Sequence, residues 1–274
     1  MVTFNNLAAA AGVVLLSGQH VLAAELTKVN YANNATSQAE MYIYVPDNVV
    51  ESPPLVVVIR IGYITLWPSS PNQGTCWDVS SPQSLFRGGG GDSSAIANMI
   101  EHALAEYGAD RERVYLTGGS SGAMMGNVMA AAYPDLLKAV SVYSGVPAGC
   151  FVSSAGQVAG WNNTCSGGQS QASPEQWGNV VRDMYPGYDG PRPKMQIWHG
   201  SVDSTLAPQN YKETIKQWTN VFGVDQTPTN SVQNYPAPNY QTDDYGENVQ
   251  GIFANGVGHS VPANLTASEL WFGL

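Results

Sequence analysis

The chain has 274 residues, 43% of them hydrophobic and 10% aromatic, which is enough for one large domain with a substantial core. Only 12% of the residues are charged and the formal net charge is -10 at pH 7, which argues against a nucleic acid or another polyanion as a partner. Low charge together with many Gly, Asn, Ser, Thr and Tyr is typical of a secreted protein with a neutral, polar surface.

The first residues predict a cleaved signal peptide. An apolar run over residues 7–16 is too short to span a bilayer, small residues follow at 21–24, and no later segment is long and apolar enough to be transmembrane. We therefore expect a signal peptide over residues 1–24 and a single domain over residues 25–274, with a first helix of the fold as the alternative for the apolar run. Three sequons predict glycosylation on a secretory route, at Asn34, Asn162 and Asn264.

The N-terminal half predicts strands whose spacing is unusual. Residues 40–46 read as an antiparallel edge strand, and residues 55–59 form a continuous β-branched run typical of parallel strands buried on both faces. A second run over residues 63–67 follows after only three residues, whereas neighbouring parallel strands need a crossover of about a dozen residues or more. This spacing permits only a hairpin or one long strand bent at Gly62.

Residues 68–91 read as a loop that ends in four glycines, and Asp92 or Ser93 then caps a helix with one apolar face. The glycine run follows no predicted strand and lacks a Gly-Lys-Ser/Thr ending. We interpret it as a flexible turn near the cleft rather than as a phosphate cradle.

A short buried strand then runs into Gly-Gly-Ser-Ser-Gly at residues 118–122 and directly into a helix over 123–132. The corner matches G-x-S-x-G with Ser120 at its centre. A tight, strained turn of this kind exposes the serine hydroxyl, so that a histidine can take its proton and a carbonyl can reach it. Gly118 and Gly122 would let neighbouring backbone pass close to the turn. Taken alone, the pattern is also compatible with a glycine-rich turn without chemistry.

The C-terminal half predicts strands over residues 139–144, 195–199 and 249–254, with a helix over 211–222 before the last of them. This alternation of strands and helices predicts a doubly wound, mostly parallel α/β sheet. The chain contains three cysteines, and Cys150 and Cys165 enclose a short loop in which a disulfide would contribute about 3 kcal/mol. Cys76 is then left without a partner.

Two further residues complete a candidate site. When a serine acts at such a corner, an acid and then a histidine follow it in the chain. His259 lies on a glycine loop after the last strand, and we predict that it acts as the base. His102 precedes the serine in the chain, and the position of His199 at a strand end favours a structural role. Asp203 directly follows a strand, at the end where catalytic groups of α/β sheets collect, and we predict that it is the acid that orients the histidine. The alternative is that Asp203 caps the start of the following segment.

Longer motifs run through nearly the whole mature chain: YLTGGSSGAMM at 115–125, YSGV at 143–146, GCF at 149–151, HGSVD at 199–203, PQNY at 208–211, GVGH at 256–259 and WFG at 271–273. They resemble the secreted fungal acetylxylan esterases, a carbohydrate-esterase group that includes feruloyl esterases and is related to polyhydroxybutyrate depolymerases. The resemblance implies an α/β-hydrolase fold with Ser120 as nucleophile, Asp203 as acid and His259 as base. It also implies deacetylation of plant-wall xylan through an acyl-enzyme, without a metal or another cofactor.

One departure from that family lies after the β-branched run. There the family has a loop with a His-Tyr-Cys type sequence and a helix, whereas here three residues lead from Ile59 to Tyr63. The resemblance implies that about 25 residues, one crossover unit, are missing. They would carry one of two oxyanion donors, which leaves the backbone N–H of Ser121, and a cysteine that could pair with Cys76. We therefore expect an α/β-hydrolase that lacks one early loop-helix segment after Ile59.

Three functions remain open. The leading one is a secreted, monomeric serine esterase that acts on acetylated xylan or a related plant-wall polysaccharide, without nucleic-acid or membrane partners. The second is a feruloyl esterase, in which Trp77, Trp161 and Tyr143 could hold a phenolic ring; Trp161 and Trp77 are also candidates for stacking on sugars. The third is a catalytically impaired carbohydrate-binding remnant, because the early oxyanion loop is missing.

Overall fold

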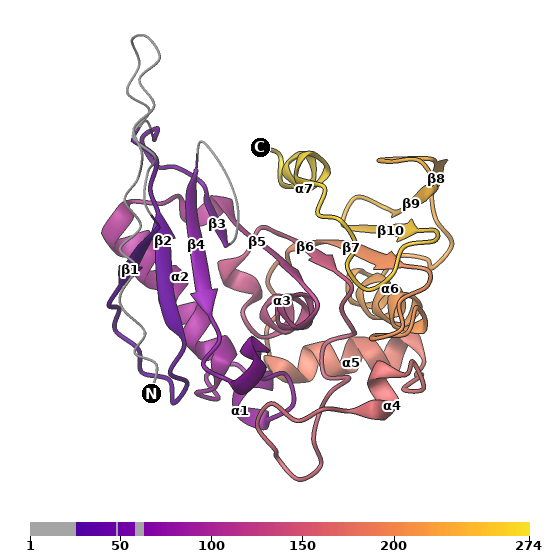
Figure 1. Ribbon diagram of the computed structural model, residues 1–274, viewed down its shortest axis with the longest axis horizontal. Coiled ribbons are helices and arrows are strands. Elements are labelled where there is room, and N and C mark those ends of the chain that lie inside the picture. Colours follow the sequence, from indigo (N-terminus) through magenta and orange to yellow (C-terminus); the bar gives the residue numbers. More distant parts are fainter. Residues whose placement is uncertain (1–25, 48, 58–62) are drawn as a thin grey trace, which may run out of the picture.

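The structure is a computed structural model that describes residues 26–47, 49–57 and 63–274. Its strands belong to one sheet in the order β1-β2-β4-β3-β5-β6-β7-β10-β9-β8, which runs across Figure 1. The strands are β1 (Thr27–Val29), β2 (Glu40–Tyr44), β3 (Leu55–Val57), β4 (Ile64–Ser69), β5 (Val114–Gly119), β6 (Ala139–Tyr143), β7 (Lys194–Gly200), β8 (Asn230–Gln233), β9 (Tyr240–Tyr245) and β10 (Val249–Ala254). The helices are α1 (Pro82–Leu85), α2 (Asp92–Tyr107), α3 (Ser121–Ala132), α4 (Asn163–Ser166), α5 (Pro174–Met184), α6 (Gln209–Phe222) and α7 (Leu265–Phe272), with short 3-10 turns at Gln73–Thr75, Arg111–Arg113 and Pro134–Leu136.

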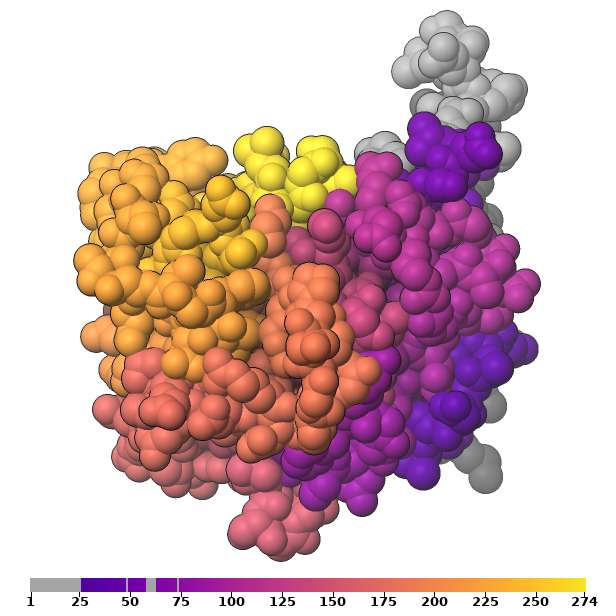
Figure 2. Space-filling model, turned by 180° about the vertical axis from the view of Figure 1, so that it is seen from behind, coloured from indigo at the N-terminus to yellow at the C-terminus, as the bar shows by residue number. Residues whose placement is uncertain are grey.

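The predicted mostly parallel α/β sheet is confirmed. Strands β4, β3, β5, β6, β7 and β10 are parallel neighbours, and antiparallel strands extend the sheet at both ends. Seen from behind, the C-terminal part of the chain accordingly forms one side of the molecule and the N-terminal part the other (Figure 2).

Helices cover both faces of the sheet. On one face α2, α3, α5 and α6 share the main hydrophobic core with the strands, and on the other face α7 packs against Tyr143, Trp198 and Tyr115 (Figure 1). Helix α3 lies very close to the sheet, because a methyl group on Gly126 would come within 2.8 Å of Val142 Cγ1. Small side chains in α3 therefore bring its N-terminus, and with it Ser120, tightly onto the end of β5.

Two expectations for the N-terminal strands are wrong. Strand β2 is not an edge strand, because the short strand β1 pairs along its outer side and β4 along its inner side. Strands β3 and β4 form neither a hairpin nor one bent strand but a parallel pair, with Leu55 opposite Ile64. Both corrections reflect pairing across the sheet, which overrides what the spacing along the chain suggests.

Some expectations fall outside the described residues. The signal peptide predicted over residues 1–24 lies there, as do Ile59 and Gly62 in the connection between β3 and β4. Within the described ranges, the helices are all too short or too polar to cross a membrane.

Candidate active site

Ser120 occupies a strained corner between β5 and α3. Its φ is +53° and its ψ is -121°, a conformation that non-glycine residues rarely adopt and that costs about 1–3 kcal/mol. The corner is held by the Ser120 N–H, which donates to Tyr143 O at 2.9 Å. Gly118 is required here, since a Cβ at this position would lie 2.6 Å from Gly122 O. The same expectation for Gly122 is wrong, because a Cβ there would meet nothing within 4 Å.

Asp203 lies in a tight turn after β7. Its side chain is buried, and Oδ1 accepts the backbone N–H groups of Thr205 and Leu206, both at 2.9 Å. Burial alone would raise the pKa of Asp203, but hydrogen bonds from His199, His259 and these two N–H groups outweigh it and hold the pKa well below its ordinary value. Asp203 therefore caps its own turn through one carboxylate oxygen and presents the other as an ionised acceptor.

His259 connects this carboxylate to the serine. Its Nδ1 lies 2.9 Å from Asp203 Oδ2, and its Nε2 lies 2.8 Å from Ser120 Oγ. An ionised carboxylate can only accept, so Nδ1 carries the proton and Nε2 is free to accept from the serine hydroxyl. The ring is 23% exposed, which leaves the site reachable. The structure thus brings together the three residues that the sequence singled out from distant positions in the chain.

The other two histidines among the described residues, His199 and His102, make no hydrogen bond to the serine. His199 is buried, and its Nε2 lies 2.9 Å from Leu206 O and 3.3 Å from Asp203 Oδ2. The hydrogen-bonded structural role predicted for His199 therefore occurs, but against the turn that carries Asp203, which the sequence did not indicate. His102 lies on α2 beside the rings of Tyr31 and Tyr107.

One of the two oxyanion donors expected for this class has a candidate within the described residues, the backbone N–H of Ser121. Ser121 is the first residue of α3, so its N–H has no partner within the helix and is available next to the nucleophile. The second donor of this class comes from the loop after the early parallel strand, which here is the connection from β3 and falls outside the described residues.

The aromatic candidates differ in accessibility. Trp161 is 59% exposed, with its Nε1 donating to Asn163 Oδ1 at 3.0 Å and its ring edge-on to Phe151. Trp77 is half-buried in a groove at the end of β4. Tyr143 cannot hold a phenolic ring as expected, because it is buried, stacked on Trp198 at 4.8 Å and hydrogen-bonded through its hydroxyl to Ser268.

The structure shows where the cysteines and the sequon asparagines lie. Cys150 and Cys165 form a disulfide, whereas Cys76 is exposed and pairs with neither of these two described cysteines. Of the three sequon asparagines, Asn34 is exposed on a loop. Asn162 and Asn264 cap helices α4 and α7 through their side-chain oxygens.

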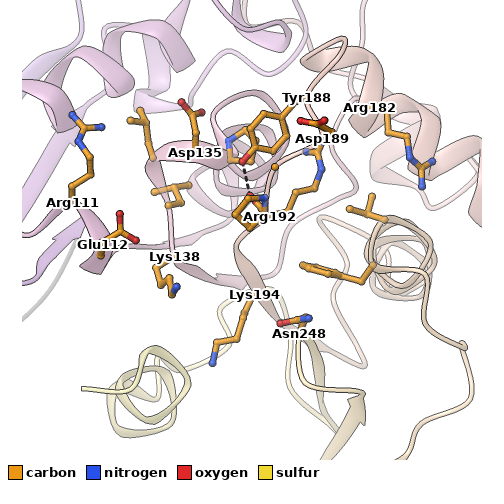
Figure 3. Close-up of a pocket in the computed structure, with 17 residues that line it drawn as sticks. Arg111, Glu112, Asp135, Lys138, Arg182, Tyr188, Asp189, Arg192, Lys194 and Asn248 are labelled. Carbon is orange, nitrogen blue, oxygen red and sulfur yellow. Dashed lines mark hydrogen bonds between the residues drawn. The ribbon is translucent and has the colours of Figure 1, made fainter.

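A cavity of about 850 Å³ lies away from the triad, at the edge where β5, β6 and β7 begin (Figure 3). Two of its arginines bind carbonyls at the ends of neighbouring helices: Arg192 donates to Ala131 O in α3 and Arg182 to Asn220 O in α6, both at 3.2 Å. Cations near helix C-termini satisfy carbonyls there and oppose the negative end of the helix dipole. This cavity therefore has a structural explanation and does not extend the site at Ser120.

Comparison with known proteins agrees with this geometry. A family model described as esterase PHB depolymerase matches residues 54–232. Acetylxylan esterase A of Aspergillus ficuum is 48% identical, with 96% of each chain covered, and a probable acetylxylan esterase A of Aspergillus fumigatus is 49% identical over 93% of this chain and 75% of its own. The solved structure of the acetyl xylan esterase from Aspergillus awamori is similar at a TM-score of 0.89 and 47% identity, covering 91% of this chain and 99% of the other.

The same comparison reveals a difference in length. The alignment with the Aspergillus ficuum protein spans 293 positions, whereas 96% of 274 residues is about 263, so about 30 positions are filled only in the relative. That number is close to the crossover unit expected to be absent after Ile59. Because the matching model covers more than half of the chain, the protein belongs to the esterase PHB depolymerase family and has its α/β-hydrolase fold.

Proposed function

We propose that this protein is a serine carboxylic-ester hydrolase that removes acetyl groups from acetylated xylan. The observation that carries the proposal is the continuous row of contacts from Ser120 Oγ through His259 to Asp203, at 2.8 and 2.9 Å. Relatives at 46–50% identity that are named acetylxylan esterases support the substrate.

In the first half of the reaction the serine is acylated. Ser120 Oγ attacks the acetyl carbonyl while His259 Nε2 takes the hydroxyl proton, and Asp203 stabilises the resulting imidazolium through Nδ1–H. The tetrahedral intermediate collapses when His259 returns that proton to the leaving sugar oxygen. The deacetylated sugar hydroxyl departs, and the acetyl group stays on Ser120.

Water then releases the acetyl group. His259 takes a proton from a water molecule, the resulting hydroxide attacks the acyl-enzyme, and the proton passes to Ser120 Oγ as acetate leaves. In both halves the N–H of Ser121 would stabilise the oxyanion. The loss of one of two such donors typically lowers the rate about 100- to 1000-fold, so we expect a slow enzyme if the early loop supplies none.

The remaining roles rest on exposure and on the likeness to fungal relatives. We propose that Trp161 stacks on sugar rings, with Trp77 as a second candidate, since a disulfide-closed loop holds Trp161 open to solvent. We also propose that the protein is secreted as a monomeric domain over residues 25–274, with glycans at the three sequons. The signal-peptide pattern supports secretion, and the disulfide is consistent with it.

Two measurements on the purified protein test the proposal. Acetate release from acetylated xylan should exceed ferulate release from methyl ferulate, and Ser120→Ala should abolish both. The opposite preference would favour the feruloyl esterase. An impaired carbohydrate-binding remnant, which the length difference favours, would bind xylan but release no acetate above the level of the Ser120→Ala variant.

A further inference from the structure

Asp78 is a buried carboxylate that the reaction does not use. It is 2% exposed, and its carboxylate has no Lys, Arg or His partner within the described ranges. Burial raises the pKa of Asp78, but hydrogen bonds from Ser81, Ala159, Ser80 and Ser84 outweigh it, so the pKa lies below its ordinary value. A buried charge without a counter-ion is maintained only where hydrogen bonds compensate it fully.

These hydrogen bonds fall into two groups. Within its own segment, Asp78 accepts from the N–H groups of Ser80 and Ser81 at 3.0 and 3.1 Å, and from the hydroxyls of Ser81 and Ser84. Across the chain, its Oδ1 accepts the Ala159 N–H at 2.9 Å. The carboxylate thus ties a loop 81 residues further along to the segment between β4 and α2.

Ser80 extends this tie to the rest of the same loop. Its hydroxyl accepts the Gly160 N–H and contacts Gln157 O, both at 2.8 Å, and its carbonyl accepts the Ser153 N–H at 2.9 Å. The Ser80 hydroxyl also lies 2.9 Å from Asp78 Oδ1. Asp78 and Ser80 together therefore fix the middle of the loop, while the disulfide Cys150–Cys165 closes its base.

The loop between these anchors carries exposed apolar side chains. Val152, Val158 and Trp161 are 52%, 58% and 59% exposed. Ala159, whose N–H binds Asp78, has a φ of +50°, so the hydrogen bond holds a strained backbone. The loop follows β6, whose last residue, Tyr143, accepts the N–H of Ser120, and it therefore leaves the sheet at the edge that carries the nucleophile.

We propose that Asp78 and Ser80 are positioning residues for polymer specificity, which hold the loop of residues 151–161 in the shape that receives a sugar chain beside Ser120. The inference rests on the proposed function, because it assumes that the polysaccharide passes over Trp161. A small ester that reaches Ser120 without touching Trp161 does not depend on this shape.

The test compares two serines that share one carboxylate. Ser80→Ala removes the hydroxyl that contacts both Asp78 and the loop. Ser81→Ala removes a hydroxyl that donates to Asp78 and that, among the described residues, makes no hydrogen bond to the loop. With Ser80→Ala we expect kcat/KM on acetylated xylan to fall about tenfold, mainly through KM, and kcat/KM on 4-nitrophenyl acetate to stay within about twofold. Ser81→Ala should leave the ratio of the two substrates unchanged.

Asp78 is tested by a conservative and a disruptive variant. Asp78→Asn keeps an acceptor for the Ala159 N–H, so the ratio of xylan activity to small-ester activity should stay close to that of the wild type. Asp78→Ala removes the acceptor, so this ratio should fall. Equal losses on both substrates in Ser80→Ala, or no loss on xylan, would overturn the proposal.

Limited proteolysis supplies a readout that does not need catalysis. Cleavage within residues 151–161 should be faster in Ser80→Ala than in the wild type or in Ser81→Ala. Equal cleavage in all three would contradict the positioning role. Since this result does not depend on ester hydrolysis, it separates failure of the positioning role from failure of the proposed function.

Discussion

At the scale of single residues, Asp203 lies between two imidazoles. His259 contacts Asp203 Oδ2 from the side of the serine, and His199 approaches the same oxygen at 3.3 Å from the buried side. The Nε2–H of His199 also reaches Leu206 O, in the turn whose N–H groups hold Oδ1. His199 therefore stabilises the turn that aims the carboxylate at His259.

Two substitutions at His199 separate a donor role from simple packing. His199→Leu removes the donor and should lower kcat on 4-nitrophenyl acetate about 10- to 100-fold, because the carboxylate loses its alignment. His199→Gln places an amide donor near the same position and should recover most of that loss. Steady-state kinetics with thermal melts of both variants test this, and equal kcat values for the two variants would count against the donor role.

The depressed pKa of Asp203 makes a prediction about acid stability. Its pKa in the folded protein lies below the unfolded value of about 3.9, so the folded state favours the ionised form. The stabilisation is complete above that value and is lost as the pH falls below about 4. In urea titrations between pH 7 and pH 3, the stability difference between the wild type and Asp203→Asn should therefore shrink in the acid range. A difference that stays constant down to pH 3 would contradict the assignment.

Single residues differ in how far the sequence reveals them. Ser120, Asp203 and His259 could be predicted because each follows a strand that itself has a clear pattern, and the parallel sheet brings those strand ends together. The burial of Tyr143 could not, because it depends on Trp198 and on Ser268 in α7, which lie 55 and 125 residues away. The contact of His199 with the Asp203 turn depends on side-chain direction, which spacing alone does not give.

At the scale of elements, the corner from β5 into α3 depends on one glycine. A Cβ on Gly118 would lie 2.6 Å from Gly122 O, whereas a Cβ on Gly122 would enter open space. Gly118→Ala should therefore displace the serine, reduce ester hydrolysis strongly and lower stability by about 1–3 kcal/mol.

Gly122→Ala is the matched control for the fold. Its thermal midpoint should equal or exceed that of the wild type, since alanine favours a helix over glycine by up to about 1 kcal/mol. Differential scanning calorimetry of the two variants tests the pair. A Gly118→Ala protein as stable as Gly122→Ala would show that the corner tolerates the methyl group.

The elements with strong local patterns were predicted well and the others were not. The β-branched strands and the helices after Ser120 and before the last strand appear near their expected positions. Strand β1 has only three residues and no pattern that marks it, so the sequence does not reveal that β2 is an inner strand. The short spacing between β3 and β4 does not predict their parallel pairing. The direction of β3 is set by its parallel pairing with β5, and that of β4 by its antiparallel pairing with β2.

At the scale of the whole molecule, the sheet of the family is present while the chain is shorter than its relatives. About 30 aligned positions are filled only in the Aspergillus ficuum protein, and a parallel pair such as β3 and β4 normally has a crossover of about a dozen residues or more between its strands. We expect that segment, placed after β3, to supply the second oxyanion donor.

A graft tests this expectation. Residues 58–62 are replaced by the corresponding segment of the Aspergillus ficuum relative, and kcat on 4-nitrophenyl acetate is measured. The second donor should raise kcat about 100- to 1000-fold over that of the present chain. The same graft on Ser120→Ala should stay inactive. A folded graft with unchanged kcat would show that the segment contributes nothing to the oxyanion site.

The most direct measurement is covalent labelling of the nucleophile. The purified protein is treated with a phosphonate ester that reacts with activated serines, and the labelled peptide is identified by mass spectrometry. We predict one adduct, on Ser120, and a strongly reduced rate of labelling in His259→Ala, because the base at 2.8 Å is then lost. Labelling at another residue, or equal labelling rates with and without His259, would contradict a serine esterase built on Ser120, His259 and Asp203.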